Sequence, residues 1–132
     1  METTKNILVV DDEPDAIEFV KAVLSDLKNI NIISAKDGRE CLEKAVSSKP
    51  DLIILDVIMP GMDGFLVFDE LRNTNETKDT PVIMLTGVAD KVGIKFIKDD
   101  MKKYIGKEPL DYIEKPLDPT VLQNVVRNAL KI

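Results

Sequence analysis

The sequence predicts an α/β domain in which five parallel strands form one doubly wound sheet with helices on both faces. Two observations favour this fold. Short apolar runs rich in β-branched residues alternate along the chain with segments of helical periodicity. The apolar runs are also nearly continuous, which is typical of parallel strands buried on both faces. Right-handed crossovers then place helices on each side of the sheet. The length of 132 residues fits one ordinary domain, so we expect residues 1–132 to form a single domain.

The predicted strands are four or five residues long, and polar or turn residues follow them. They are residues 6–10, 30–34, 52–55, 81–85 and 111–114.

Four segments carry apolar residues at helical spacing, namely residues 14–27, 37–47, 64–72 and 118–130. Pro14 suits a first helical turn, and Asp118 followed by proline is a good N-cap. A further helix is expected between residues 86 and 110, although two glycines and many lysines weaken its pattern. The side chains expected to face the core are Ile17, Val20, Val23, Leu24, Leu27, Cys41, Leu42, Ala45, Val46, Phe65, Phe68, Leu71, Val121, Leu122, Val125, Val126, Ala129 and Leu130.

Composition excludes several classes of function. The net charge of −6 argues against direct nucleic-acid binding and against a basic membrane-surface segment. No apolar run approaches the roughly 20 residues that span a bilayer, and the N-terminus has no secretory pattern, so we expect no membrane insertion. The single cysteine, Cys41, cannot form an internal disulfide, which favours the cytoplasm. The absence of histidine excludes His-based triads, His metal ligands and a phosphohistidine on this chain.

Polar side chains stand at the ends of four of the five predicted strands. Asp11 and Asp12 follow the first strand, Asp56 ends the third, Thr86 follows the fourth and Lys115 follows the fifth. Each residue alone fits an ordinary role, such as a helix cap or a solvated lysine. In a doubly wound sheet, however, ligands bind beyond the carboxyl ends of the strands, so all five side chains are expected at one edge.

The residue types at this edge indicate a phosphoryl-acceptor site. Three clustered carboxylates repel one another and call for a counter-cation, and carboxylate oxygens without softer ligands suit Mg²⁺. Asp56 supplies a nucleophile, while the Thr86 hydroxyl and the Lys115 ammonium can hold phosphoryl oxygens. No Gly-rich phosphate loop is present, so direct binding of a nucleoside triphosphate is not expected.

With these motifs, the chain resembles the bacterial response-regulator receiver domains of two-component signalling, including stand-alone chemotaxis regulators. The resemblance rests on "DD" at 11–12, "DVIMPGMDG" at 56–64, "LTG" at 85–87 and "KP" at 115–116. It implies a flavodoxin-like (βα)5 fold with strand order 2-1-3-4-5. It also implies a phosphoryl group received from a sensor histidine kinase or phosphotransfer protein, a downstream protein target, and no turnover of an independent substrate.

The same resemblance implies a role for each site residue. Asp56 is the phosphorylated residue, and Asp12, Asp56 and the backbone carbonyl of Ile58 ligate Mg²⁺ directly, with Asp11 acting through metal-bound water. Thr86 hydrogen-bonds the phosphoryl group, Lys115 pairs with it, and the Lys115–Pro116 bond is cis. Thr86 and Tyr112 form the switch: on phosphorylation Thr86 moves toward the phosphate, Tyr112 turns inward, and the face of the fourth helix and fifth strand changes.

The chain departs from the family between Thr86 and Lys115, where it is longer than usual. The extra residues fall around the fourth helix, which forms the usual output face. The expected assembly is a monomer or a dimer that forms on phosphorylation. The chain fits either a stand-alone receiver or a piece of a longer protein.

Three other functions compete with a phosphorylated receiver. A phosphatase of the aspartyl-phosphate class typically needs an acid two residues after the nucleophile, where Ile58 stands. A flavodoxin-like cofactor binder needs a phosphate loop after the first strand, where "DDEPDA" would repel a phosphate. A receiver-like module that binds partners without phosphorylation would not need all five polar site residues.

Overall fold

The structure is a computed structural model that describes residues 3–59, 62–87 and 109–132. It confirms the five predicted strands and four of the predicted helices to within a few residues at each end. The further helix expected between residues 86 and 110 falls on residues 88–108, which lie outside the described residues. In chain order the elements are β1 (Lys5–Val10), α1 (Pro14–Leu24), β2 (Ile30–Ala35), α2 (Gly38–Ser48), β3 (Leu52–Asp56), β4 (Ile58–Met59), β5 (Met62–Asp63), α3 (Gly64–Arg72), β6 (Val82–Thr86), β7 (Asp111–Glu114) and α5 (Pro119–Leu130).

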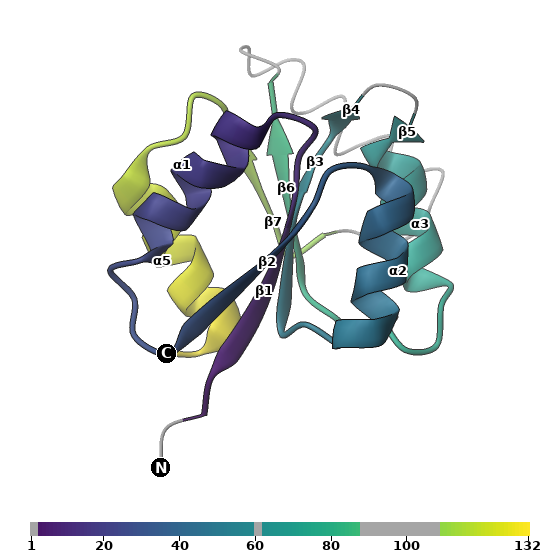
Figure 1. Ribbon diagram of the computed structural model, residues 1–132, viewed down its shortest axis with the longest axis horizontal. Coiled ribbons are helices and arrows are strands. Elements are labelled where there is room, and N and C mark those ends of the chain that lie inside the picture. Colours follow the sequence, from purple (N-terminus) through teal and green to yellow (C-terminus); the bar gives the residue numbers. More distant parts are fainter. Residues whose placement is uncertain (1–2, 60–61, 88–108) are drawn as a thin grey trace.

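The main sheet has five parallel strands in the order β2-β1-β3-β6-β7, which is the expected order 2-1-3-4-5. Helices α1 and α5 cover one face of this sheet, and α2 and α3 cover the other (Figure 1). Strands β4 and β5 form a separate antiparallel pair directly after β3. The sequence did not predict this pair, because two residues are too few to show a period.

Two apolar layers account for the nearly continuous apolarity of the strands. Successive strand residues point to opposite faces, so each central strand contributes to both layers. In β1, for example, Ile7 and Val9 pack under α1 and α5, whereas Leu8 and Val10 pack under α2 and α3. All residues of β3 and β6 are buried. The two layers hold the strand ends of the main sheet at fixed spacing.

Three helix predictions differ from the structure in detail. Helix α1 ends at Leu24 with Ser25 as its C-cap, although Leu27 beyond it is still buried. Val46 and Val121 are exposed, not part of the core. Both valines flank the buried stripe of a short amphipathic helix, whose centre is filled by residues such as Cys41 and Leu122. A sequence period predicts the stripe well but not its margins.

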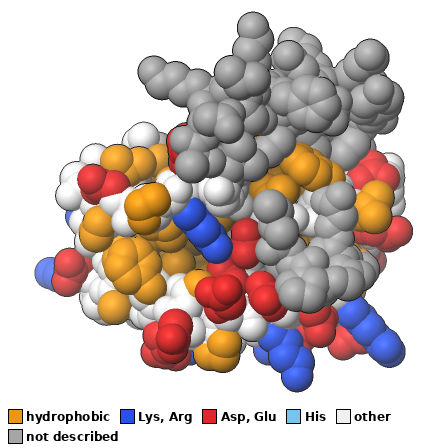
Figure 2. Space-filling view, turned by 90° about the horizontal axis from the view of Figure 1, so that it is seen from above, with side chains coloured by type: hydrophobic (Ala, Val, Ile, Leu, Met, Phe, Trp, Pro, Cys, Tyr) orange, Lys and Arg blue, Asp and Glu red, His pale blue; other side chains and the backbone are white. Residues whose placement is uncertain are grey.

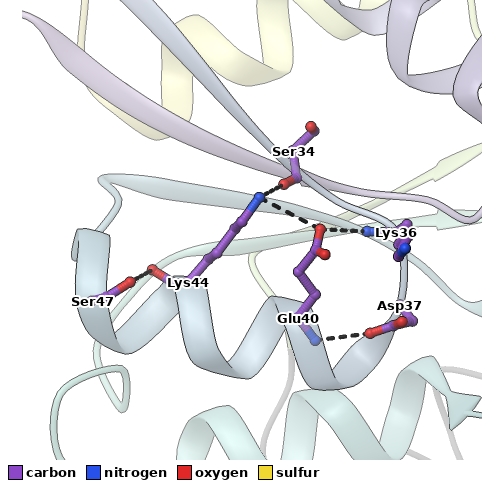
Figure 3. A network of polar contacts seen from close by, with 6 residues as sticks. All are labelled: Ser34, Lys36, Asp37, Glu40, Lys44 and Ser47. Atoms are coloured by element: carbon purple, nitrogen blue, oxygen red, sulfur yellow. Dashed lines mark hydrogen bonds and ion pairs between the residues drawn. The ribbon is translucent and has the colours of Figure 1, made fainter.

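Polar contacts fasten the start of α2 to the edge strand β2 (Figure 3). The Asp37 carboxylate accepts a hydrogen bond from the backbone N–H of Glu40 at 2.8 Å and so caps the helix. The Glu40 carboxylate in turn accepts from the backbone N–H of Lys36 and lies 3.5 Å from the Lys44 ammonium. Lys44 also donates to the carbonyl of Ser34, which satisfies a backbone group of the edge strand.

Cys41 is expected to be chemically inert in the folded protein. Its side chain is fully buried, and burial, assisted by the nearby charge of Asp37, raises the pKa of the thiol from 9.0 to about 12. At pH 8 this leaves about a thousandfold less thiolate than an exposed cysteine has. Reaction with a disulfide reagent, followed by absorbance, should therefore be at least about a hundredfold slower than in denaturant. Equal rates in the two conditions would show that the thiol is accessible.

Candidate functional site

The sheet register brings four of the predicted site residues to one edge. Val10 pairs with Leu55 in the parallel ladder, so Asp11 and Asp56 are neighbours at the ends of β1 and β3. Thr86 is the last residue of β6 and is buried, and its carbonyl accepts a 2.7 Å hydrogen bond from the backbone N–H of Lys115. The strand ends, which the core fixes, therefore set the spacing of the site.

Three carboxylates meet at this edge. One oxygen from each of Asp11, Asp12 and Asp56 lies within 4.8 Å of the other two. Asp11 and Asp56 are buried, at 2% and 5% exposure, whereas Asp12 is exposed. Figure 2, which looks down on this edge, shows acidic side chains gathered beside a basic one. The Asp11 carboxylate also accepts the backbone N–H of Glu13 at 3.0 Å, which fixes its orientation at the start of α1.

Lys115 bridges the two buried carboxylates. Its ammonium lies 3.3 Å from Asp11 Oδ2 and 3.2 Å from Asp56 Oδ2. Burial lowers the pKa of this ammonium, but the charges of Asp56 and Asp11, together with the hydrogen bonds they accept, outweigh burial and raise the pKa above its ordinary value. Lys115 therefore stays charged at neutral pH and offsets one of the three negative charges.

The donor set fits a hard divalent cation. The cluster of three carboxylates and one ammonium carries two net negative charges. All three groups offer oxygen, and at least one of them, Asp12, remains open to solvent. Mg²⁺ prefers carboxylate oxygens and keeps several water ligands, so a half-open cluster of this kind suits it. The cluster of Asp11, Asp12 and Asp56 could bind such an ion, and the roles of the three residues stay predictions.

Gly64 is a site residue that the sequence analysis did not single out. A Cβ atom at this position would lie 2.7 Å from the carbonyl oxygen of Asp56 and 2.7 Å from Cα of Val57. The backbone N–H of Gly64 donates to the Val57 carbonyl at 2.8 Å. The start of α3 thus packs directly against the backbone of Asp56 and Val57. The sequence signal that could have indicated this contact was a glycine at the first position of an apolar helix, shortly after a buried strand.

Replacing Gly64 by Ala is expected to destabilise the protein by about 1–3 kcal/mol, because the methyl group meets backbone that has to move. The shift would also displace Asp56. Chemical denaturation would measure the loss, and Gly87→Ala is the matched control, since among the described residues a Cβ at Gly87 would meet no atom within 4 Å beyond its chain neighbours. Equal stability of the two variants would mean that α3 does not constrain the backbone of Asp56.

The structure also describes the Lys115–Pro116 bond, Tyr112 and the backbone of Ile58. The Lys115–Pro116 bond is cis, as expected. Tyr112 packs in β7 against the core layer under α2 and α3, and its hydroxyl oxygen is buried. The backbone of Ile58 belongs to β4, two residues after Asp56, and its role as a metal ligand stays a prediction.

The family follows from comparison with known proteins. The family model of the response regulator receiver domain matches residues 7–127 of this chain. The chain belongs to the response regulator receiver domain family. The strand order, the Asp cluster and the Lys115 position of this receiver agree with that assignment.

Individual relatives agree with the family model. The alkaline phosphatase synthesis transcriptional regulatory protein PhoP of Bacillus subtilis is 35% identical over 129 residues, covering 96% of this chain and 49% of PhoP. The chemotaxis protein CheY4 of Vibrio cholerae superposes with a TM-score of 0.81 at 30% identity, covering 97% of this chain and all of CheY4. A putative response regulator from Chloroflexus aurantiacus has a TM-score of 0.83 at 30% identity, over 98% of this chain and all of that structure.

The receiver spans about half the length of the first curated relatives that it matches. Within the described residues, no helix is long and apolar enough to cross a membrane.

Proposed function

We propose that this receiver accepts a phosphoryl group on Asp56 from a sensor histidine kinase or phosphotransfer protein and passes the signal on by protein contact. Residues 1–132 act as one receiver domain in this proposal, and the domain turns over no independent substrate. The observation that carries the proposal is the contact of Lys115 with two buried carboxylates inside a cluster of three. Phosphorylation and Mg²⁺ are typical of the receiver family.

Each residue has a task that its position supports. A carboxylate oxygen of Asp56 attacks the phosphorus atom of a phosphohistidine on the donor protein, and as the new O–P bond forms the donor's P–N bond breaks and its imidazole leaves. Lys115, 3.2 Å from the Asp56 carboxylate, holds a phosphoryl oxygen and stabilises its charge. Thr86, buried at the end of the neighbouring strand, donates its hydroxyl hydrogen to another phosphoryl oxygen. Asp11, Asp12 and Asp56, with the Ile58 carbonyl, would hold Mg²⁺, which when bound neutralises charge on the phosphoryl oxygens.

The output of the proposal is a change on the face that contains β7. Thr86 moves toward the phosphoryl group, and the ring of Tyr112 follows into the space that it leaves. The hydroxyl oxygen of Tyr112 is already buried in this structure, so the ring can occupy the inward position that the proposal gives to the phosphorylated receiver. A downstream protein, or a second copy of the receiver, would recognise the changed face. The lone thiol Cys41 has no partner for an internal disulfide, which supports a cytoplasmic setting.

Incubation with acetyl phosphate, with and without Mg²⁺, tests the proposal. Intact-mass spectrometry should show one added phosphoryl group per chain when Mg²⁺ is present and little or none when it is absent. A mass that never changes would contradict phosphorylation and would favour a module that binds partners without it. A phosphate ester that does not transfer its phosphoryl group spontaneously tests the phosphatase alternative. Steady release of inorganic phosphate from it, far beyond one equivalent per chain, would indicate a phosphatase.

Mg²⁺ is expected to stabilise the fold through the same cluster. At ten times its dissociation constant the ion should add about 1.4 kcal/mol to the free energy of unfolding, or about 5 °C to the melting temperature. Asp12→Asn should remove most of this gain, whereas Asp15→Asn, which changes an exposed acid in α1, should keep it. Thermal melts with graded Mg²⁺ measure the gain. Equal gains in both variants would place the ion elsewhere.

A further inference from the structure

A groove of about 400 Å³ runs beside the carboxylate cluster, between α1 and the loop that starts at Lys115. Its volume lies in the range of small-molecule sites, roughly 300–1,000 Å³. In Figure 2 an apolar area adjoins the acidic and basic side chains on this side of the molecule. The apolar side chains that line the groove are Ala16, Phe19, Val20, Leu85, Pro116 and Leu117.

Phe19 is the largest apolar side chain in the lining and is 42% exposed, although most large apolar residues in the described part of the chain are buried. A half-exposed aromatic ring beside other apolar side chains has an unfavourable hydration free energy. A small apolar group placed against Phe19, Val20 and Leu117 would remove this surface from water. The groove therefore favours a ligand with an aromatic or aliphatic part.

The charges around the groove favour a cation. The Lys115 ammonium is compensated by Asp11 and Asp56 at 3.3 and 3.2 Å, so it offers little attraction to an anion. Glu13 lines the groove, and its carboxylate neither caps α1 nor makes a hydrogen bond or ion pair within the described part of the chain. The other acid of the lining is Asp11, which Lys115 compensates. The uncompensated Glu13 carboxylate, with a full negative charge, outweighs the positive end of α1, which is worth about half a charge.

We propose that this groove binds a small amphiphilic cation, with its apolar part against Phe19 and Leu117 and its ammonium group beside Glu13. The ligand class is therefore an aromatic or alkyl amine. Amine binding does not require phosphorylation of Asp56, although the groove shares Asp11 and Lys115 with the carboxylate cluster. Because Lys115 lines the groove and also contacts Asp56, a bound amine would restrain this lysine.

Three probes with the same ring test the proposal: tryptamine as the cation, 3-methylindole as the neutral form and indole-3-acetate as the anion. The chain has no tryptophan, so the indole fluorescence anisotropy of each probe reports its own binding. Measurements without Mg²⁺ and without a phosphoryl donor keep the result independent of Asp56 phosphorylation. Tryptamine should bind with a dissociation constant of about 1 mM, as is typical of a ligand this small. The neutral probe should bind several-fold more weakly, and the anion more weakly still.

Two variants locate the site. Phe19→Ala should weaken tryptamine binding about tenfold, because the ring supplies much of the apolar contact. Glu13→Gln should weaken tryptamine several-fold but leave 3-methylindole unchanged, whereas Glu18→Gln, on α1 and paired with Lys21, should change neither. Amide shifts of the groove residues in NMR titrations should follow the same order. An anion that binds as tightly as the cation, or tryptamine binding unaffected by Phe19→Ala and Glu13→Gln, would overturn the proposal.

Discussion

Asp56→Asn is expected to abolish phosphoryl transfer to the receiver and, without Mg²⁺, to raise its free energy of unfolding by about 1–2 kcal/mol. The amide cannot form an acyl phosphate, which explains the first effect. The second follows from the charges. The variant loses one attraction to Lys115, but it also loses two repulsions, from Asp11 and Asp12, and the cost of burying a carboxylate at 5% exposure. The Asp56 carboxylate is thus expected to destabilise the metal-free fold, as residues kept for function often do.

Urea denaturation without metal measures the stability effect, and intact-mass spectrometry after acetyl phosphate treatment measures the chemical one. Asp26→Asn is the matched control, since Asp26 is an exposed acid whose carboxylate accepts a 3.2 Å hydrogen bond from Gln123. It should label normally and change stability by less than about 0.5 kcal/mol. A labelled Asp56→Asn variant would contradict the proposed role of Asp56, and a destabilised one would show that the Lys115 contact outweighs the repulsions.

Lys115→Met should have the opposite effect on stability. It keeps the length of the side chain but removes the only charge within 4 Å, in the described part of the chain, that compensates Asp11 and Asp56. Two buried carboxylates are then left without a counter-charge, which should cost about 1–3 kcal/mol after allowance for the 30% exposure of the Lys115 side chain. The rate of labelling by acetyl phosphate should fall at least about tenfold, because the positive charge that stabilises the phosphoryl oxygens is lost.

Added Mg²⁺ should restore part of the stability lost in Lys115→Met, since both cations offset the same carboxylates. Lys21→Met is the control: Lys21 forms one surface ion pair with Glu18 at 3.5 Å, so its loss should change stability by less than about 1 kcal/mol. If the two methionine variants were equally stable with and without Mg²⁺, Lys115 would not be the counter-charge of the cluster.

The sequence predicted most of the fold because the decisive signals are local. Nearly continuous apolar runs such as residues 52–55 mark strands buried on both faces, and the structure shows alternate residues of β3 in opposite apolar layers. The polar residues that follow those runs then meet at one edge by the geometry of parallel strands. For this reason the approach of Asp11, Asp56 and Lys115 was foreseeable from strand ends alone.

What the sequence missed depends on distances between segments. The contact of Gly64 with the backbone of Asp56 is a packing constraint across the loop after β3, and a lone glycine does not reveal what a Cβ would meet. The individual distances from Lys115 to Asp11 and Asp56 likewise depend on how distant segments pack, and so does the groove beside Phe19. Exposed Val46 and Val121 show the reverse error, since an apolar residue at the margin of a helical stripe can face water.

The central claim is that Asp56, and neither of its two neighbouring carboxylates, receives the phosphoryl group. Phosphorylation with acetyl phosphate and Mg²⁺, followed by borohydride reduction, converts an aspartyl phosphate to homoserine at the residue that carried it. Tandem mass spectrometry of the resulting peptides then reads the position directly. We predict homoserine at position 56 alone, with Asp11 and Asp12 unchanged. Homoserine at position 11 or 12, or at none of the three, would contradict the account.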